Sequence, residues 1–185
     1  KLNDIKLLDD GLEFTAKAKS LPLVIPEEAA EGVKLTKLGH KFSREAVEIH
    51  GLQPGKYRLT IDDQEVGTYT NLQLERHLEL QANDKTPQYQ QAAEVAALNK
   101  VRNDGPVHEL RGIWSQFQRY SRHLRQLAAE PNSEEVTELV SKAESELGDL
   151  EKRVKEAEAK AKEIEDKIFE INQPKPRVYR FTRVD

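Results

Sequence analysis

The sequence contains no cysteine and no methionine in its 185 residues. The absence of cysteine excludes a disulfide framework, a thiolate nucleophile and a cysteine-based zinc site, and it leaves the redox compartment open. The chain begins at Lys1 and shows no charged-then-apolar leader. We therefore expect it to be a processed chain or an excised piece of a longer protein rather than a complete translation product, and we favour the excised piece.

Long apolar runs are also missing. No stretch of about eighteen apolar residues occurs in the sequence, so we expect no membrane-spanning helix. The formal net charge of −4 argues against binding to nucleic acid or to an anionic membrane surface. Charged residues make up 34% of the chain, a share that is high for a single compact globule and favours a small core with an extension.

Alternating apolar residues predict a β module in the first part of the chain. In residues 3–18 two such runs flank Asp10–Gly11, which is a strong signal for a hairpin. A second hairpin is predicted in residues 52–70, and residues 44–52 and 174–185 are predicted as further strands. The apolar residues that share one face of a predicted strand are Ile5 and Leu7; Leu12, Phe14 and Ala16; Val47 and Ile49; Tyr57, Leu59 and Ile61; and Tyr179 and Phe181.

Two stretches of this module have weaker patterns. Residues 20–32 contain two prolines and are predicted to be extended or irregular. Residues 72–80 fit a short helix and a strand equally well, and both interpretations stay open.

From Thr86 onward the pattern is that of helices. Thr86 suits the N-cap of a first helix and Pro87 its first position, where the missing N–H costs nothing. Gly105 is expected to end this helix in the left-handed conformation, and Pro106 to open a second helix. The second helix carries a mostly apolar stripe at alternating steps of three and four; its residues are Val107, Leu110, Trp114, Phe117, Ser121, Leu124 and Ala128.

A third helix has the most regular pattern in the chain. Residues 130–133 (EPNS) interrupt the second helix, and Ser133 is expected to cap the third. The apolar residues that follow predict a coiled-coil seam, against which Trp114 and Phe117 are expected to pack. The seam consists of Val140, Ala143, Leu147, Leu150, Val154, Ala157, Ala161, Ile164, Ile168 and Ile171.

The helix lengths predict an antiparallel hairpin. A short connection makes neighbouring helices antiparallel, and the first two helices together match the third in length, so 87–103 and 107–128 are predicted to pack against 133–172. The predicted fold class is therefore α+β: a small antiparallel β module with a long helical-hairpin arm and a returning C-terminal strand. The module takes residues 1–85 and 174–185, and the arm takes residues 86–173. Whether the hairpin pairs within one chain or swaps between two stays open.

Residue types that often carry catalysis are present, but they form no catalytic constellation in the sequence. No serine lies in a G-x-S-x-G turn, and no glycine-rich phosphate loop occurs. The acidic pairs Asp9–Asp10 and Asp62–Asp63 are predicted to be turn residues, with calcium binding as a minor alternative. We assign no catalytic, cofactor-binding or metal-binding residue. The histidines, none of which shows metal-ligand spacing on a predicted helix, are His40, His50, His77, His108 and His123.

A set of short motifs runs through residues 10–29, 48–80 and 86–103. As a set, they resemble the region that follows the catalytic domain in bacterial SGNH (GDSL-type) hydrolases, in which a β module leads into a helical segment and a short final strand. The motifs are a Leu-x-x-Gly-x-Tyr-x-Leu-x-Ile-Asp strand (Leu52, Gly55, Tyr57, Leu59, Ile61 and Asp62), a Thr-Pro-Gln-Tyr helix start (Thr86 to Tyr89), Leu98–Asn99, and Ile171–Asn172 with a proline shortly after.

The catalytic residues of that family have no counterpart in this chain. The Leu-Gly-Asp at 147–149 lacks the serine of the family's Gly-Asp-Ser block, and Asp104 and His108 are one residue too far apart for its Asp-x-x-His pair. The resemblance therefore implies that both blocks lie upstream of Lys1, in a catalytic domain that is this chain's expected partner.

On that resemblance the chain is a non-catalytic accessory region of an exported ester hydrolase, and its arm shapes substrate access or forms a homodimer. Two other classes stay open. One is a self-standing protein-interaction module that uses the coiled-coil-like arm. The other is a carbohydrate-binding β module, for which Tyr57, Tyr69 and Tyr179 are the candidate aromatics.

Overall fold

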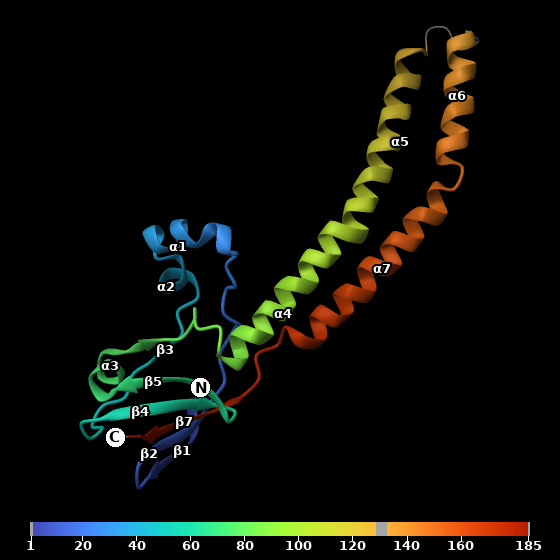
Figure 1. Ribbon diagram of the computed structural model, residues 1–185. Helices are drawn as coiled ribbons and strands as arrows, with labels where there is room; N and C mark the ends of the chain where they lie inside the picture. Colours follow the sequence, from blue (N-terminus) through green and yellow to red (C-terminus); the bar gives the residue numbers. More distant parts are fainter. Residues whose placement is uncertain (1, 129–132, 185) are drawn as a thin grey trace. The chain divides into compact units, whose positions relative to one another are not determined.

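The computed structural model describes residues 2–128 and 133–184 (Figure 1). It shows a mixed α+β protein with an antiparallel sheet, long helices and a C-terminal strand that returns to the sheet, which confirms the predicted fold class. The chain divides into two compact units. The first comprises Lys1–Ala96 together with Glu170–Asp185, and the second is Ala97–Phe169. Within the described residues no helix is both long and apolar enough to cross a membrane.

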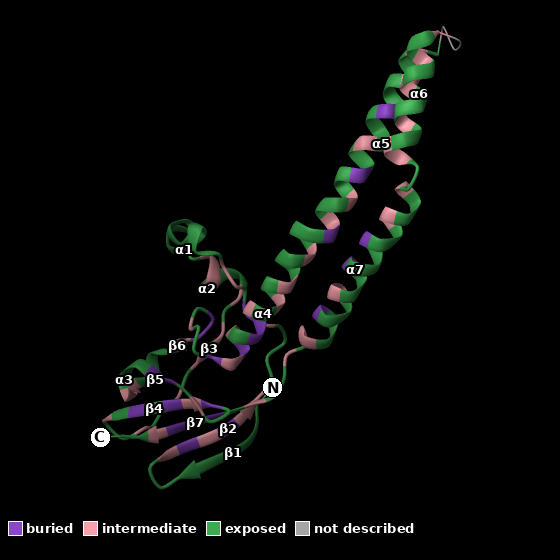
Figure 2. Ribbon diagram, turned by 45° about the vertical axis from the view of Figure 1, so that its right-hand side comes forward, coloured by how far each residue is buried: buried purple, intermediate pink, exposed green. Residues whose placement is uncertain are grey.

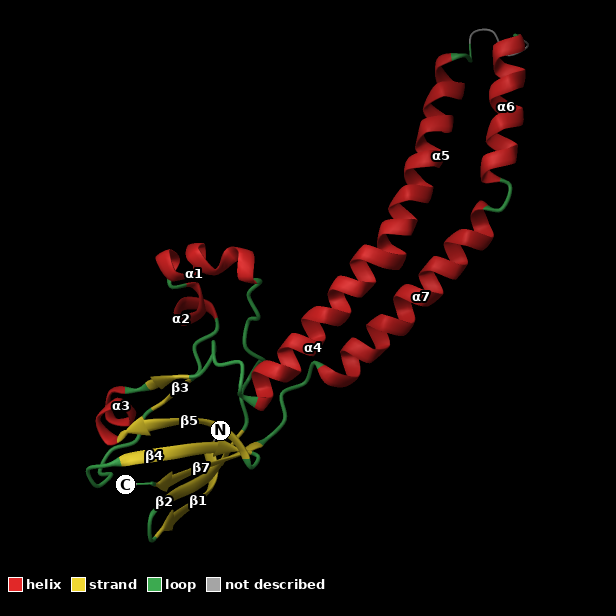
Figure 3. Ribbon diagram, in the orientation of Figure 1, coloured by secondary structure: helices red, strands yellow, loops and turns green. Residues whose placement is uncertain are grey.

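The first unit is built on an antiparallel sheet with the strand order β1-β2-β7-β4-β5 (Figure 3). The C-terminal strand β7 lies in the middle of this sheet and pairs with β2 on one side and β4 on the other. Residues from the two ends of the chain therefore share one sheet. The strands are β1 (Leu2–Leu8), β2 (Gly11–Ala16), β4 (Lys56–Ile61), β5 (Gln64–Thr70) and β7 (Arg177–Arg183).

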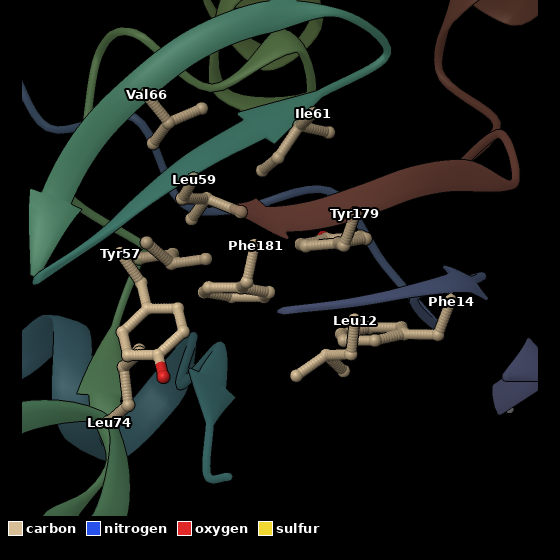
Figure 4. Packing of buried hydrophobic residues seen from close by; sticks show 10 residues of the cluster. Leu12, Phe14, Tyr57, Leu59, Ile61, Val66, Leu74, Tyr179 and Phe181 are labelled. Carbon is tan, nitrogen blue, oxygen red and sulfur yellow. The ribbon is translucent and has the colours of Figure 1, made fainter. Parts of the chain in front are cut away.

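The core of this unit lies on one face of the sheet. Phe181 is fully buried and lies between side chains from β2 and side chains from β4 (Figure 4). Its register partners are Leu12 and Leu59, so the alternation that predicted a shared face in each strand also brings the three faces together. The buried cluster consists of Leu12, Phe14, Tyr57, Leu59, Ile61, Val66, Leu74, Leu80, Tyr179 and Phe181.

Both predicted hairpins are present. The turn between β1 and β2 falls at Asp9–Asp10, and Gly11 opens β2. A Cβ atom on Gly11 would lie 1.8 Å from the carbonyl oxygen of Phe181, so only glycine permits this close approach of β2 to β7.

The turn between β4 and β5 has an unusual backbone for its residues. Asp62 and Asp63 both have positive φ, at 51° and 63°, as a two-residue type I′ hairpin requires. Because glycine adopts this conformation with little strain, we expect Asp63→Gly to raise the free energy of unfolding by about 0.5 kcal/mol. Urea titrations followed by circular dichroism would measure it.

Asp62 provides the control for that prediction. Its carboxylate accepts hydrogen bonds from Arg177 Nη1 at 2.7 Å and from the Val178 N–H at 2.9 Å. Asp62→Gly should therefore lower stability although the backbone conformation is the same. Stabilisation of equal size in both variants would show that the turn conformation is not the cause.

Short elements lie between the two hairpins and after the second. The prediction that residues 20–32 are extended or irregular is wrong for its last part, because the chain is helical from Glu27. The strand predicted over 44–52 is reduced to two residues, and 72–80 contains both a short helix and a short strand. These elements are η1 (Glu27–Ala29), α1 (Ala30–Thr36), α2 (Leu38–Phe42), β3 (Ala46–Val47), α3 (Asn71–Arg76) and β6 (Leu78–Glu79).

The long helices follow the predicted boundaries with two corrections. Gly105 is not left-handed (φ −93°, ψ −106°), because the backbone continues from α4 into α5 through one wide turn instead of ending. The predicted third helix is interrupted at Gly148–Asp149, two residue types with low helix propensity. The elements are α4 (Pro87–Arg102), η2 (Asn103–Val107), α5 (His108–Gln126), α6 (Glu134–Leu147) and α7 (Leu150–Ile171).

The predicted helix caps can be checked at two places. The Thr86 hydroxyl accepts a hydrogen bond from the Tyr89 N–H at 3.3 Å, and Ser133 Oγ accepts one from the Val136 N–H at 3.3 Å. Both caps are confirmed. The predicted connection at 130–132 lies outside the described residues.

Ion pairs show that the helices of the second unit run antiparallel. Arg102 lies 3.5 Å from Glu165, and Arg119 lies 3.5 Å from Glu146. From the first ion pair to the second, the residue number rises from 102 to 119 in one helical segment and falls from 165 to 146 in the other, as in a helical hairpin. Along α7 the seam is buried at Ala157, Ala161 and Ile168 (Figure 2).

The prediction that Trp114 and Phe117 pack on this seam is wrong. Their exposed fractions are 50% and 40%, whereas Ile113 and Tyr120 are buried. The apolar stripe on α5 is therefore rotated by one residue from the predicted one.

Candidate functional site

Two histidines that are distant in the sequence meet one carboxylate in the first unit. His40 lies on α2, His77 follows α3 and Glu79 lies on β6; together they line a cavity of about 530 Å³. His40 Nδ1 is hydrogen-bonded to Glu79 Oε1, and His77 Nε2 lies 3.6 Å from the same oxygen. The second oxygen of Glu79 accepts a hydrogen bond from Gln81 Nε2 at 2.6 Å. The hydrogen bond from His40, followed by that from Gln81, holds the pKa of Glu79 below its usual range.

The contacts of His40, His77 and Glu79 are those of a hydrogen-bonded group. Both imidazoles approach the same carboxylate oxygen, so the three side chains form a hydrogen-bonded group rather than an open ligand cage. No group of three or more His, Asp or Glu side chains that could hold a metal ion occurs in the described part of the chain. The nearby Ser43 hydroxyl accepts a hydrogen bond from the Leu23 N–H at 2.8 Å.

The lowered pKa of Glu79 predicts a change of stability with pH. A carboxyl group whose pKa is lowered on folding stabilises the fold above its ordinary value of 4.5, and this contribution is lost as the pH falls through the lowered value. We expect the stability difference between the parent protein and Glu79→Gln to shrink as the pH falls from about 6 to about 3. Glu28→Gln removes a carboxylate at an exposed position on η1 and is the matched control for the substitution itself. A difference for Glu79→Gln that does not change with pH would contradict the prediction.

A second polar group is buried at the junction of β7, α4 and the segment before β3. The Tyr179 hydroxyl donates to Glu45 Oε1 at 2.9 Å and accepts from Gln88 Nε2 at 3.0 Å. Burial, and then the nearby Glu45 carboxylate, raise the pKa of Tyr179 far above its usual range, so its hydroxyl stays protonated and keeps donating. These bonds join three segments that are distant in the sequence, and their role is structural.

The remaining candidates from the sequence have ordinary partners. Asp62 is bound by Arg177 and a backbone N–H, so its acidic pair is not arranged for calcium. His50 Nε2 lies 2.6 Å from Glu48 Oε1, which raises the pKa of His50. His108 and His123 lie on α5, in the second unit.

The tyrosines proposed for carbohydrate binding are not exposed platforms. Tyr57 and Tyr179 are buried in the core, and Tyr69 is partly buried with its hydroxyl 3.3 Å from Asn83 Nδ2. A stacking surface for sugars needs an accessible ring face, so the structure removes the basis for the carbohydrate-binding alternative.

A second cavity, of about 540 Å³, has mostly apolar walls. It lies beside β1, β2 and the segment around β3. Sequence reasoning missed both cavities, because each is assembled from segments separated by loops of unpredictable course. Strand alternation gave the only signal for the second cavity. It identified several of its wall residues as members of shared faces, among them Ile5, Phe14 and Val47.

Comparisons with known proteins give one informative match. No family model matches the chain, and no curated protein matches it. Among solved structures, the chain is similar to "BT4096 a gut microbial diltiazem-metabolizing enzyme", with a TM-score of 0.81 and 26% sequence identity. The match covers 100% of this chain and 46% of that chain, so this chain spans less than half the length of the enzyme that it resembles.

Proposed function

We propose that this chain is a non-catalytic accessory region of an SGNH/GDSL-type ester hydrolase. The observation that carries the proposal is the match of the whole chain to less than half of an enzyme chain, at a TM-score of 0.81. A fold of this kind thus occurs in an enzyme together with a larger remaining part. The motif resemblance supplies the class of that enzyme, and the hydrolytic residues then belong to the remaining part.

The positions of the shared motifs support an accessory role. Tyr57, Leu59 and Ile61 of the strand motif are buried core residues, and Thr86 caps α4. These four motif residues therefore stabilise the fold, either as buried core side chains or as a helix cap. None of these three core side chains is accessible to a substrate.

The helical hairpin has two roles in this proposal. It restricts access to a neighbouring active site, or it joins two copies of the enzyme. The parent enzyme acts on esters and is exported, as in the family that the motifs resemble. The role of the hairpin, the ester substrate and the export all require that a catalytic domain is part of the same protein.

The first experiment is to sequence the coding DNA on both sides of this region. A reading frame that contains a Gly-Asp-Ser block followed by an Asp-x-x-His block supports the proposal. The complete product should hydrolyse an activated ester such as p-nitrophenyl acetate, and the 185-residue chain alone should not. Hydrolysis that follows the 185-residue chain through purification would contradict it, as would a reading frame without those blocks. Loss of diltiazem, followed chromatographically, gives a second substrate test.

An exposed aromatic pair favours a second function, that of an interaction module. The rings of Trp114 and Phe117 lie edge to face with centroids 5.6 Å apart, and both are accessible on α5. Exposed large aromatics are frequent in protein interfaces. If this function holds, Trp114→Ala abolishes self-association or partner binding in analytical ultracentrifugation and leaves helicity unchanged.

A further inference from the structure

The apolar face of the sheet continues onto β1, where no element of the first unit covers it. Leu2 pairs with Ala16 across the sheet and Leu7 pairs with Leu12, so these leucines lie on the core face. A register shift between Asn3 and Lys6 keeps both on that face. The β1 surface, defined here as Leu2, Ile5 and Leu7, is nevertheless 58%, 63% and 87% exposed (Figure 2).

The rest of the same face is covered. Leu74 of α3 and Leu80 after β6 are fully buried in the core cluster, and Val47 and Ile49 pack against it. This cover ends beside β1 and leaves the apolar cavity of about 540 Å³, whose walls include Leu2, Ile5, Val47 and Ile49.

The opposite face of β1 is typical of a solvated surface. Lys6 Nζ lies 3.1 Å from Glu13 Oε1, and Arg180 Nη2 lies 2.6 Å from Glu13 Oε2. The strand is therefore clearly two-sided, with charge outward and large apolar side chains on the core face. That pattern is expected of a strand in a sheet that is covered along its whole width.

An uncovered strand of this kind is a liability. β1 is the edge of the sheet and pairs only with β2 within the described residues. A seven-residue edge strand with an exposed apolar face favours aggregation, and proteins usually cover or shorten such a strand. The β1 surface and the adjoining cavity thus have the character of an interface whose other side is absent from these 185 residues.

We propose that the β1 surface docks the catalytic domain of the ester hydrolase. This inference rests on the proposed function. More than half of the similar enzyme's chain lies outside the aligned part, which provides a body large enough to cover the strand. The docking surface of that domain presents apolar side chains to Leu2, Ile5 and Leu7, and at least one of them enters the cavity.

Two equally exposed leucines give a matched pair of variants. Leu7 on the β1 surface is 87% exposed and Leu35 on α1 is 86% exposed. Leu7→Lys and Leu35→Lys should each leave the unfolding midpoint of the 185-residue chain unchanged. In the complete protein only Leu7→Lys should lower the midpoint.

Amide hydrogen exchange measures the cover directly. Peptides from β1 should exchange at least about tenfold more slowly in the complete protein than in the 185-residue chain, and Leu7→Lys should remove that protection. Peptides from α1 should exchange equally in both.

The outcomes separate the two proposals. If the complete protein hydrolyses esters but β1 exchanges as fast as in the isolated chain, the docking proposal is wrong and the proposed function stands. If the reading frame encodes no catalytic block, the proposed function fails and this occupant fails with it. If the isolated chain dimerises and Leu7→Lys restores the monomer, the occupant is a second copy, which also overturns the proposal.

Discussion

Phe181→Ala should cost about 3–5 kcal/mol of unfolding free energy, one of the largest losses expected in this protein. Phe181 has no exposed surface, its ring lies 6.2 Å from that of Phe14, and its strand is the centre of the sheet. Removing the ring leaves a cavity between β2 and β4 that rigid strands cannot close. Urea unfolding followed by circular dichroism measures the loss.

Val178 on the same strand is the matched control. It faces the other side of the sheet and is 39% exposed, so Val178→Ala should cost at most about 1 kcal/mol. If Phe181→Ala does not fold, Phe181→Leu provides a milder test and should fold with a smaller loss. Equal losses for Val178→Ala and Phe181→Ala would show that burial at the sheet centre does not dominate stability.

Ala157→Glu should be about as severe, with an expected cost of about 3–5 kcal/mol. Ala157 has no exposed surface and lies on the seam of α7, where a longer side chain meets the facing helix and its charge loses water without gaining a partner. The expected result is a lower melting temperature for the helical signal at 222 nm.

Ala159 provides the exposed control for the substitution at Ala157. It lies two residues further along α7 on the exposed side, so Ala159→Glu introduces the same side chain into solvent. We expect it to leave the melting temperature nearly unchanged, since surface substitutions usually act within about 0.5 kcal/mol. Similar losses for the two variants would contradict the seam at Ala157.

The α5 stripe illustrates the limit of periodicity. Steps of three and four residues fit Leu110, Trp114 and Phe117, and they fit Leu110, Ile113 and Tyr120 almost as well. The structure buries Ile113 and Tyr120 of the second set, and Tyr120 lies near the Arg119–Glu146 ion pair. A helix face is about 100° wide, so pattern alone cannot separate stripes that are one residue apart.

The candidate polar sites could not be predicted for a different reason. His40 and Glu79 are separated by 39 residues, and Glu45 and Tyr179 by 134. His40 is positioned by α2, which the sequence did not predict, and the preceding residues 20–32 were predicted as extended or irregular although the chain is helical from Glu27. Spacing rules find ligands and catalytic groups only when one helix or one strand positions them.

The sequence by itself determined the hairpins, the long helical part and the final strand, and their order. Alternation and turn residues predicted both hairpins and the final strand, and the Thr86–Pro87 and Ser133 signals predicted two helix starts. These features depend on interactions over a few residues, which a sequence displays directly. Only the tertiary structure decided that β7 lies between β2 and β4, that Ile113 and not Trp114 is buried, and that β1 keeps its apolar face uncovered. Those outcomes depend on which strand and helix faces, distant in the sequence, pack against one another. That packing is set by the burial of apolar side chains over the whole fold.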